Sequence, residues 1–253
     1  MTNEEAHRIA REKGVSRPLY AIVRFVVVPF MRLFWGLRIT NAERIPAEGA
    51  AIITPNHKSF YDSFFLAPAT KRHLRFMGKS ELFEGAFGKT FVRLGAFPVR
   101  RGESDAEALE TARVILEQGG LLSLFPEGTR VRDPEALGVP KRGAVRLALE
   151  SGAPLIPAAI TGTERLFAGP LPRPTTVRVS FGDPVEVEEI PATPEAASGL
   201  LTDELWPQVE SEYGRLRAHP GLIAAGLAAV GIGAGIAAKR RRASRGKHGR
   251  RRR

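Results

Sequence analysis

The sequence contains no cysteine in its 253 residues. This absence excludes disulfide bonds, a thiolate nucleophile, a zinc site built on cysteine and an iron–sulfur cluster. In other respects the composition is that of a globular protein, with 43% hydrophobic and 26% charged residues. The chain is long enough to form one sizeable hydrophobic core with a small extension.

Three catalytic signatures are also missing. There is no Gly-x-Ser-x-Gly segment and therefore no nucleophile elbow, and Ser59, two residues from His57, is poorly placed for a serine hydrolase. A phosphate-binding loop at Gly88 is excluded because Phe83 stands where the motif requires its first glycine. The histidines are scattered and none forms the His-Glu-x-x-His pattern of zinc proteases. We therefore predict neither a metal site nor a cofactor.

Positive charge is concentrated at one end of the chain. The net charge is +11, but residues 239–253 hold ten lysines and arginines and no acid, and the rest of the chain holds 28 basic and 27 acidic residues. Such a tail predicts an anionic partner. Because the tail has no aromatic residue for base stacking, we expect an anionic membrane surface and no specific nucleic acid. A non-catalytic membrane- or nucleic-acid-binding protein that uses this tail is the alternative of a different class.

Residues 18–37 form a long apolar segment that contains Arg24 and Arg32. Each arginine would cost about 2.5–3.5 kcal/mol near the centre of a membrane-spanning helix. On a helical wheel, Arg17, Arg24, Arg32 and Arg38 share about one third of the circumference. This pattern predicts a helix that lies in the membrane interface with its arginines toward lipid phosphates. The alternative is a core helix whose arginines mark the solvent face.

A second apolar segment, residues 221–238, is rich in alanine and glycine and precedes the basic tail. It is interpreted either as a shallow membrane insertion or as a flexible linker. The first 17 residues lack the apolar stretch of a secretion signal. We therefore expect the protein at the cell membrane, peripheral or monotopic, with its catalytic domain on the cytoplasmic side.

Residues 38–192 alternate short apolar runs with helical stretches, between a membrane-associating segment at 1–37 and an amphipathic helix within 193–219. The alternation predicts an α/β domain with a mostly parallel central sheet flanked by helices. The Ala/Gly-rich segment and the tail occupy 220–253. Strands are expected at 51–54, 74–77, 95–99, 121–125, 155–160 and 177–181, and helices at 59–69, 80–93, 104–118, 142–151 and 195–216.

The first candidate site directly follows the strand expected at 51–54, in the run Asn56-His57-Lys58-Ser59-Phe60-Tyr61-Asp62. Open α/β sheets place their sites at the carboxyl ends of strands. In a turn that leads into a helix, Asp62 can reach back to the His57 imidazole, fix its tautomer and leave Nε2 to accept a proton. The structural alternative is that Ser59 and Asp62 form a capping box.

Basic residues follow the other expected strands. Arg100 and Arg101 come after the strand at 95–99, Arg130 lies in a Pro/Gly turn after 121–125, and Lys79 and Lys141 add to the same edge. The guanidinium fork of arginine suits a phosphate group because it donates two parallel hydrogen bonds. The cluster predicts a phosphate site. Any one of these side chains taken alone is more often a solvated surface charge.

Taken in order, four motifs resemble the glycerolipid acyltransferase family and are most similar to its bacterial 1-acylglycerol-3-phosphate acyltransferases. They are Asn-His-x-x-x-x-Asp from Asn56, Gly-Ala-Phe-Pro-Val-Arg-Arg from Gly95, Phe-Pro-Glu-Gly-Thr-Arg from Phe125, and Pro-Leu-Ile-Pro up to Pro157. The motifs cover about 100 residues in the middle of the chain. Finding all four in this order is highly specific.

The resemblance implies transfer of a fatty acyl group from acyl-CoA or acyl-carrier protein to the hydroxyl of 1-acyl-glycerol-3-phosphate, which gives phosphatidic acid. Another lysophospholipid or glycerol-3-phosphate stays open as the acceptor. His57 would be the general base and Asp62 its orienting partner, and Arg101 would bind the acceptor's phosphate unless the neighbouring Arg100 does so. The substrate-binding residues expected from the basic edge and the resemblance together are Lys79, Arg101, Glu127, Gly128, Thr129, Arg130 and Lys141.

Overall fold

The computed structural model describes residues 1–100 and 105–218. The chain divides into two units, Met1–Leu216 and Arg217–Arg253, and all but the last two of the described residues belong to the first. The Ala/Gly-rich segment, the basic tail and Arg101 lie outside the described residues. Their predicted roles therefore stay predictions.

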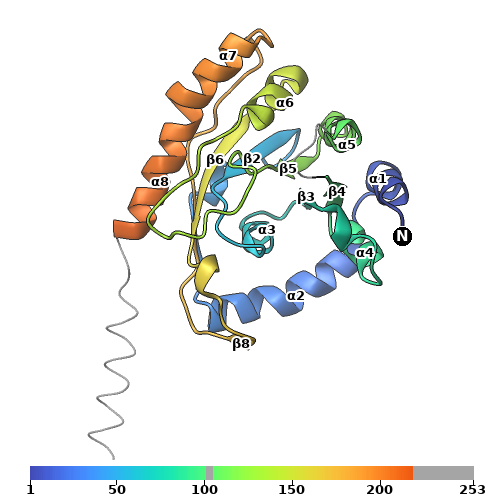
Figure 1. The fold of residues 1–253 in the computed structure, drawn as a ribbon, viewed down its shortest axis with the longest axis vertical. Coiled ribbons are helices and arrows are strands. Elements are labelled where there is room, and N and C mark those ends of the chain that lie inside the picture. Colours follow the sequence, from blue (N-terminus) through green and yellow to red (C-terminus); the bar gives the residue numbers. More distant parts are fainter. Residues whose placement is uncertain (101–104, 219–253) are drawn as a thin grey trace, which may run out of the picture. The chain divides into compact units, whose positions relative to one another are not determined.

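A seven-stranded sheet forms the centre of the first unit (Figure 1). Most neighbouring strands are parallel, and β9 is antiparallel to β6. The predicted mostly parallel sheet is thus confirmed. In order across the sheet, the strands are β1 (Arg38–Thr40), β9 (Arg178–Phe181), β6 (Leu155–Thr161), β2 (Ala51–Pro55), β5 (Leu121–Ser123), β3 (Leu74–Lys79) and β4 (Ala96–Val99), and β7 (Phe167–Ala168) and β8 (Leu171–Pro172) form a separate hairpin.

Helices cover both faces of the sheet, which therefore has an apolar core on each side. Consecutive residues of β2 point to opposite faces, so Ile52 packs in one core and Ile53 in the other. The helices are α1 (Asn3–Glu12), α2 (Arg17–Phe34), α3 (Asp62–Leu66), α4 (Gly88–Arg93), α5 (Ala106–Glu117), α6 (Gly143–Ser151), α7 (Pro194–Gly199) and α8 (Trp206–Ala218). Figure 1 shows α3 lying between α2 and the strands.

Two expected helices are shorter than predicted, and one is interrupted. The helix expected at 80–93 splits into the 3-10 turn Ser80–Leu82 and α4, because the chain passes so closely at Gly88 that a Cβ there would lie 2.1 Å from the Phe83 carbonyl oxygen. The helix expected at 59–69 is limited to α3 and a 3-10 turn that contains Pro68. A π-helical turn, Leu200–Leu205, separates α7 from α8.

The first helix packs against the domain. It contacts α4, α5 and β4, and it buries Ala6, His7 and Ala10. His7 Nδ1 lies 2.8 Å from Thr111 Oγ1, and Arg75 from β3 donates to the Ala10 carbonyl at 2.9 Å. One face of the N-terminal segment is therefore part of the folded body.

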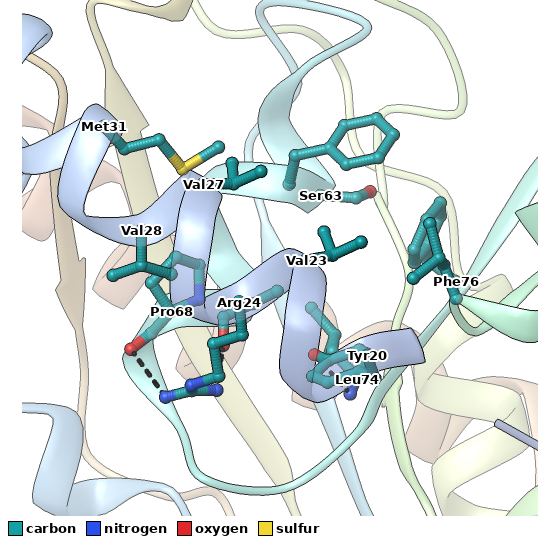
Figure 2. A pocket seen from close by; sticks show the side chains of 13 residues that line it. Tyr20, Val23, Arg24, Val27, Val28, Met31, Ser63, Pro68, Leu74 and Phe76 are labelled. Atoms are coloured by element: carbon teal, nitrogen blue, oxygen red, sulfur yellow. Dashed lines mark hydrogen bonds between the residues drawn. The ribbon is translucent and has the colours of Figure 1, made fainter. Parts of the chain in front are cut away.

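The second helix departs from both predicted orientations at Arg24, whereas Arg17 and Arg32 are exposed. Arg24 turns toward the protein and donates to the carbonyls of Ala67 at 3.3 Å, Pro68 at 3.5 Å and Thr70 at 2.5 Å. Figure 2 shows Arg24 beside Pro68. The prediction that Arg24 faces lipid phosphate or solvent is wrong, because carbonyls left unpaired at the end of a helix need a donor. The outer face of α2 is largely apolar instead, with Ile22, Phe25, Val26, Phe30 and Leu33 exposed.

Among the described residues, no single helix has the length and apolar character needed to cross a membrane. The consecutive helices α1 and α2, bent by 96° against each other, satisfy the same length and composition criteria only when they are taken together.

Candidate active site

The topology brings the predicted motifs to one edge of the sheet. Strands β2, β5, β3 and β4 are mutually parallel, so their carboxyl ends face the same way. His57 follows β2, the segment 125–130 follows β5, Lys79 ends β3, and Arg100 follows β4. These are the positions at which an open α/β sheet presents a binding site.

A buried carboxylate orients the histidine. Asp62 is completely buried, and its Oδ2 lies 2.8 Å from His57 Nδ1. The same oxygen accepts the backbone N–H groups of Lys58 at 2.7 Å and Ser59 at 2.8 Å, while Oδ1 accepts the Thr163 hydroxyl at 2.5 Å. The carboxylate therefore both holds the turn and orients the ring, so the predicted contact with the turn and the predicted contact with the imidazole occur together.

This hydrogen bond determines which nitrogen of His57 is available. An ionised carboxylate only accepts hydrogen bonds, so the proton of a neutral imidazole is assigned to Nδ1 and the lone pair to Nε2. The Phe125 ring stacks on the imidazole with centroids 4.0 Å apart, which restricts rotation of the ring. His57 can therefore act as a base through Nε2, with Asp62 stabilising the imidazolium that forms.

A second buried carboxylate holds the backbone of the same residue. Glu127 is 2% exposed and accepts the N–H of His57 at 2.9 Å and the N–H of Gly138 at 2.8 Å. Burial raises the pKa of Glu127 above its ordinary value. Both oxygens bind backbone groups, so Glu127 positions His57, and its expected contact with substrate stays a prediction.

Lys58 is a positioning residue that the sequence analysis missed. It is 2% exposed, and its Nζ donates to the carbonyls of Asp133, at 2.7 Å, and Ala136. The ammonium also lies 4.9 Å from the ring centroid of Tyr213, whose hydroxyl donates to the Pro134 carbonyl at 2.7 Å. Burial lowers the pKa of Lys58. These contacts hold the loop that follows the Phe-Pro-Glu-Gly-Thr-Arg motif against the histidine motif.

One cavity beside His57, of about 260 Å³, is here named the aromatic cavity. Lys79 and Arg130 are exposed at its rim, and Lys79 Nζ lies 2.6 Å from Glu81 Oε1. The hydrogen bond from Lys79 lowers the pKa of Glu81 to about 2. The interior of the aromatic cavity is lined by phenylalanine side chains, namely Phe64, Phe76, Phe83 and Phe91. The cavity thus combines an apolar interior with a charged rim.

A smaller apolar cavity, of about 80 Å³, lies beneath α2 (Figure 2). It shares Ser63, Phe64 and Phe76 with the aromatic cavity. The two cavities therefore lie next to each other, with these side chains between the aromatic cavity and α2.

On its other side His57 lines a cavity of about 330 Å³, here named the polar cavity. Its lining is mixed: beside apolar side chains such as Met77, Val99 and Leu109 it includes Arg100, Lys141 and Ser123. The Ser123 hydroxyl itself is buried and has no hydrogen-bond partner among the described residues. His57 and Phe125 line both cavities, which therefore meet at the imidazole.

The expected substrate-binding residues divide between these two cavities. Lys79 and Arg130 line the aromatic cavity, and Gly128 and Lys141 line the polar cavity. Thr129 is exposed in the turn between them. Within residues 1–100 and 105–218, no group of three or more histidine, aspartate or glutamate side chains is placed to hold a metal ion.

Several known proteins share this sequence pattern. A family model described as acyltransferase matches residues 36–161. A 1-acyl-sn-glycerol-3-phosphate acyltransferase of Bacillus subtilis is 33% identical over 129 residues, which cover 50% of this chain and 63% of that protein. A probable 1-acyl-sn-glycerol-3-phosphate acyltransferase of Mycoplasma pneumoniae is 32% identical over 132 residues, which cover 49% of each. These matches span less than two thirds of either relative.

The fold also matches a solved structure. The crystal structure of the 1-acyl-sn-glycerophosphate (LPA) acyltransferase PlsC from Thermotoga maritima superposes with a TM-score of 0.65 and 25% identity. The superposition covers 84% of this chain and 83% of that one. The matching family model, the named relatives and the shared fold confirm the resemblance seen in the motifs: this chain belongs to the glycerolipid acyltransferase family.

Proposed function

We propose that this protein transfers a fatty acyl group from acyl-CoA or acyl-carrier protein to the free hydroxyl of 1-acyl-glycerol-3-phosphate, giving phosphatidic acid. The observation that carries the proposal is the His57–Asp62 pair, 2.8 Å apart, where two cavities meet. A two-substrate transfer needs a base that both substrates can reach.

In the proposed reaction, His57 Nε2 takes the proton from the acceptor's hydroxyl as its oxygen attacks the thioester carbonyl. The tetrahedral intermediate then collapses, the carbon–sulfur bond breaks, and the imidazolium returns the proton to the departing thiolate. A thioester is already activated, so no covalent enzyme intermediate is needed. General-base catalysis of this kind contributes about 10²–10⁴-fold to the rate.

The charged rim of the aromatic cavity suits the acceptor's phosphate. Lys79 and Arg130 bring two cations to the cavity that also contains His57. Arginine can bind phosphate through two parallel hydrogen bonds, and lysine adds a point charge. Because the Glu81 carboxylate pairs with Lys79 in the free protein, the acceptor's phosphate would replace this carboxylate at Lys79.

The apolar interior suits a fatty acyl chain. Its four phenylalanines and the adjoining space beneath α2 offer apolar surface. Burial of a chain gains about 0.8 kcal/mol for each methylene group removed from water. The donor's acyl chain therefore fits here, with its thioester at His57.

The outer face of α2 suits a membrane surface on the cytoplasmic side. Its Phe25 and Leu33 side chains are 83% and 87% exposed. Amphipathic helices of this kind bury their apolar face at the boundary between lipid headgroups and acyl chains. Phe25→Ser/Leu33→Ser should lower sedimentation with vesicles of anionic lipid, whereas Arg8→Gln on α1 should not. Equal binding of all three proteins would contradict attachment through α2.

The acceptor is tested with the purified full chain, palmitoyl-CoA and a panel of acceptors, with products identified by mass spectrometry. The panel contains 1-acyl-glycerol-3-phosphate, glycerol-3-phosphate and a lysophospholipid with a larger headgroup. We expect phosphatidic acid from the first to form fastest. Faster acylation of another acceptor would favour the alternative substrates, and thiol release without a lipid product would indicate a thioesterase.

A further inference from the structure

A basic groove adjoins the polar cavity at the start of α6. It has a volume of about 620 Å³ and is lined by Lys141, Arg142 and Arg146, the residues by which the groove is defined here. The single acid among its lining residues is Glu150, whose Oε2 already pairs with Arg113 at 2.7 Å and whose Oε1 lies 3.9 Å from Arg146. The groove therefore carries an excess of positive charge.

The groove shares part of its lining with the polar cavity beside His57. Lys141 and Gly143 line both the groove and the polar cavity, and His57 lines the other end of that cavity. The lining thus runs from the imidazole, past Lys141, to Arg142 and Arg146. A ligand whose reacting carbonyl is at His57 can extend along this path and place a second group between the arginines.

The chemistry of the donor matches this arrangement. A thioester has two arms, and the aromatic cavity accounts for the apolar one. The other arm of acyl-CoA and of acyl-carrier protein is phosphopantetheine, a chain with two amides that ends in a phosphate. The N–H groups of Arg100 and Lys141, which line the polar cavity, can donate to the carbonyl oxygens of these amides, whereas an alkyl chain offers them no acceptor.

We propose that the polar cavity holds the pantetheine arm of the acyl donor and that the basic groove binds the phosphate of that arm through Arg142 and Arg146. This assignment rests on the proposed acyl transfer and deepens it. With this assignment, the acceptor's phosphate and the donor's phosphate have different binding sites. The acceptor's phosphate binds at the rim of the aromatic cavity, and the donor's phosphate binds at the groove beyond the polar cavity.

The kinetic test compares the double variant Arg142→Gln/Arg146→Gln with Arg8→Gln. Arg8 is the control because it is an exposed arginine that pairs with Glu12 on α1 and does not line the groove or either cavity beside His57. We expect the double variant to raise the KM for palmitoyl-CoA about tenfold, since two partly exposed ion pairs together contribute that much. The KM for 1-acyl-glycerol-3-phosphate should not change. A rise in the acceptor's KM alone, or an equal rise in the control, would overturn the proposal.

A donor series identifies the chemical group that the groove recognises. The defect should be the same with palmitoyl-CoA, palmitoyl-phosphopantetheine and palmitoyl-acyl-carrier protein, and it should vanish with palmitoyl-pantetheine, which has no phosphate. A defect confined to palmitoyl-CoA would place the nucleotide in the groove, and one confined to the carrier protein would make it a protein-docking surface. Either result would contradict the assignment to the arm's phosphate.

A binding measurement separates this proposal from the proposed function. Free CoA is titrated into the full chain by calorimetry, so no turnover is required. The wild-type protein and His57→Ala should bind CoA equally, and Arg142→Gln/Arg146→Gln should bind it about tenfold more weakly. Equal binding by the double variant would overturn the groove assignment even if acyl transfer is found. The expected loss would support the assignment even if the acceptor proves to be another lipid.

Discussion

The two cavities that meet at His57 differ in chemistry although they share the histidine and Phe125. The aromatic cavity has four phenylalanines inside and charge only at its rim. The polar cavity has Arg100 and Lys141 in its lining and adjoins, at Lys141, a groove lined by arginines. We infer from this difference how a thioester is oriented, because the phosphate of its polar arm finds a cluster of cations beyond the polar cavity.

The largest effect should come from Asp62, which orients the histidine that both cavities share. Asp62→Asn should lower kcat about 10²-fold or more, with little change in either KM, because an asparagine no longer enforces the Nδ1–H tautomer or stabilises the imidazolium. Steady-state kinetics with both substrates varied would measure this. Asp183→Asn, at an exposed aspartate paired with Arg44, is the control. Unchanged kcat in Asp62→Asn would remove the dyad from the mechanism.

The next effect tests whether the two cavities bind different parts of the acyl donor. Ala96 lines the aromatic cavity, and Val99, on the same strand, lines the polar cavity. Ala96→Leu should shift donor preference toward shorter acyl chains, with about tenfold lower kcat/KM for palmitoyl-CoA than for a donor a few carbons shorter, since filling a cavity excludes the longest ligands first. Val99→Leu should not change chain-length preference. The same shift in both variants would contradict separate sites for the two arms.

A smaller effect is expected at the charged rim of the aromatic cavity. Glu81 and the acceptor's phosphate compete for Lys79, with which Glu81 pairs at 2.6 Å. Because the pair is solvent-exposed, Glu81→Gln should lower the KM for 1-acyl-glycerol-3-phosphate only about threefold. The KM for palmitoyl-CoA should stay the same. If the acceptor's KM rises instead, Glu81 helps to bind the acceptor and the phosphate lies elsewhere.

The smallest effect concerns the carboxylate that holds the His57 backbone. Burial raises the pKa of Glu127 in the folded protein, so the folded state binds this proton more tightly than the unfolded state does. The contribution of Glu127 to the free energy of unfolding therefore falls as pH rises from about 4, near the ordinary pKa, through the raised value. Urea denaturation between about pH 4 and pH 7 should show this fall in the wild type but not in Glu127→Gln. If the free energy of unfolding of the wild type and of Glu127→Gln changes with pH in parallel, the raised pKa of Glu127 is contradicted.

Contacts between residues that are close in the sequence could be predicted from it. His57 and Asp62 are five residues apart in a strand–turn–helix segment, so their contact could be predicted from spacing and strand position. The alternation of apolar runs and helical stretches predicted the parallel strands. The three-residue strand β1 was missed, since Arg-Ile-Thr is too short to show a pattern.

The contacts that could not be predicted join distant segments. Thr163 donates to Asp62 across 101 positions in sequence, and Glu127 binds the His57 N–H across 70. Lys58 binds backbone carbonyls, which carry no sequence signature. Arg24 was misjudged because a helical wheel shows which residues share a face but not which face meets the protein. Each of these contacts depends on tertiary packing.

The most direct measurement of the central claim is the release of CoA thiol from palmitoyl-CoA, with and without 1-acyl-glycerol-3-phosphate, by the wild type and His57→Ala. We expect release that requires the acceptor and falls about 10²–10⁴-fold in the variant. His73→Ala, at a histidine beside Tyr20 and outside both cavities, should retain activity. Release that is independent of the acceptor, or that persists unchanged in His57→Ala, would contradict acyl transfer by this histidine.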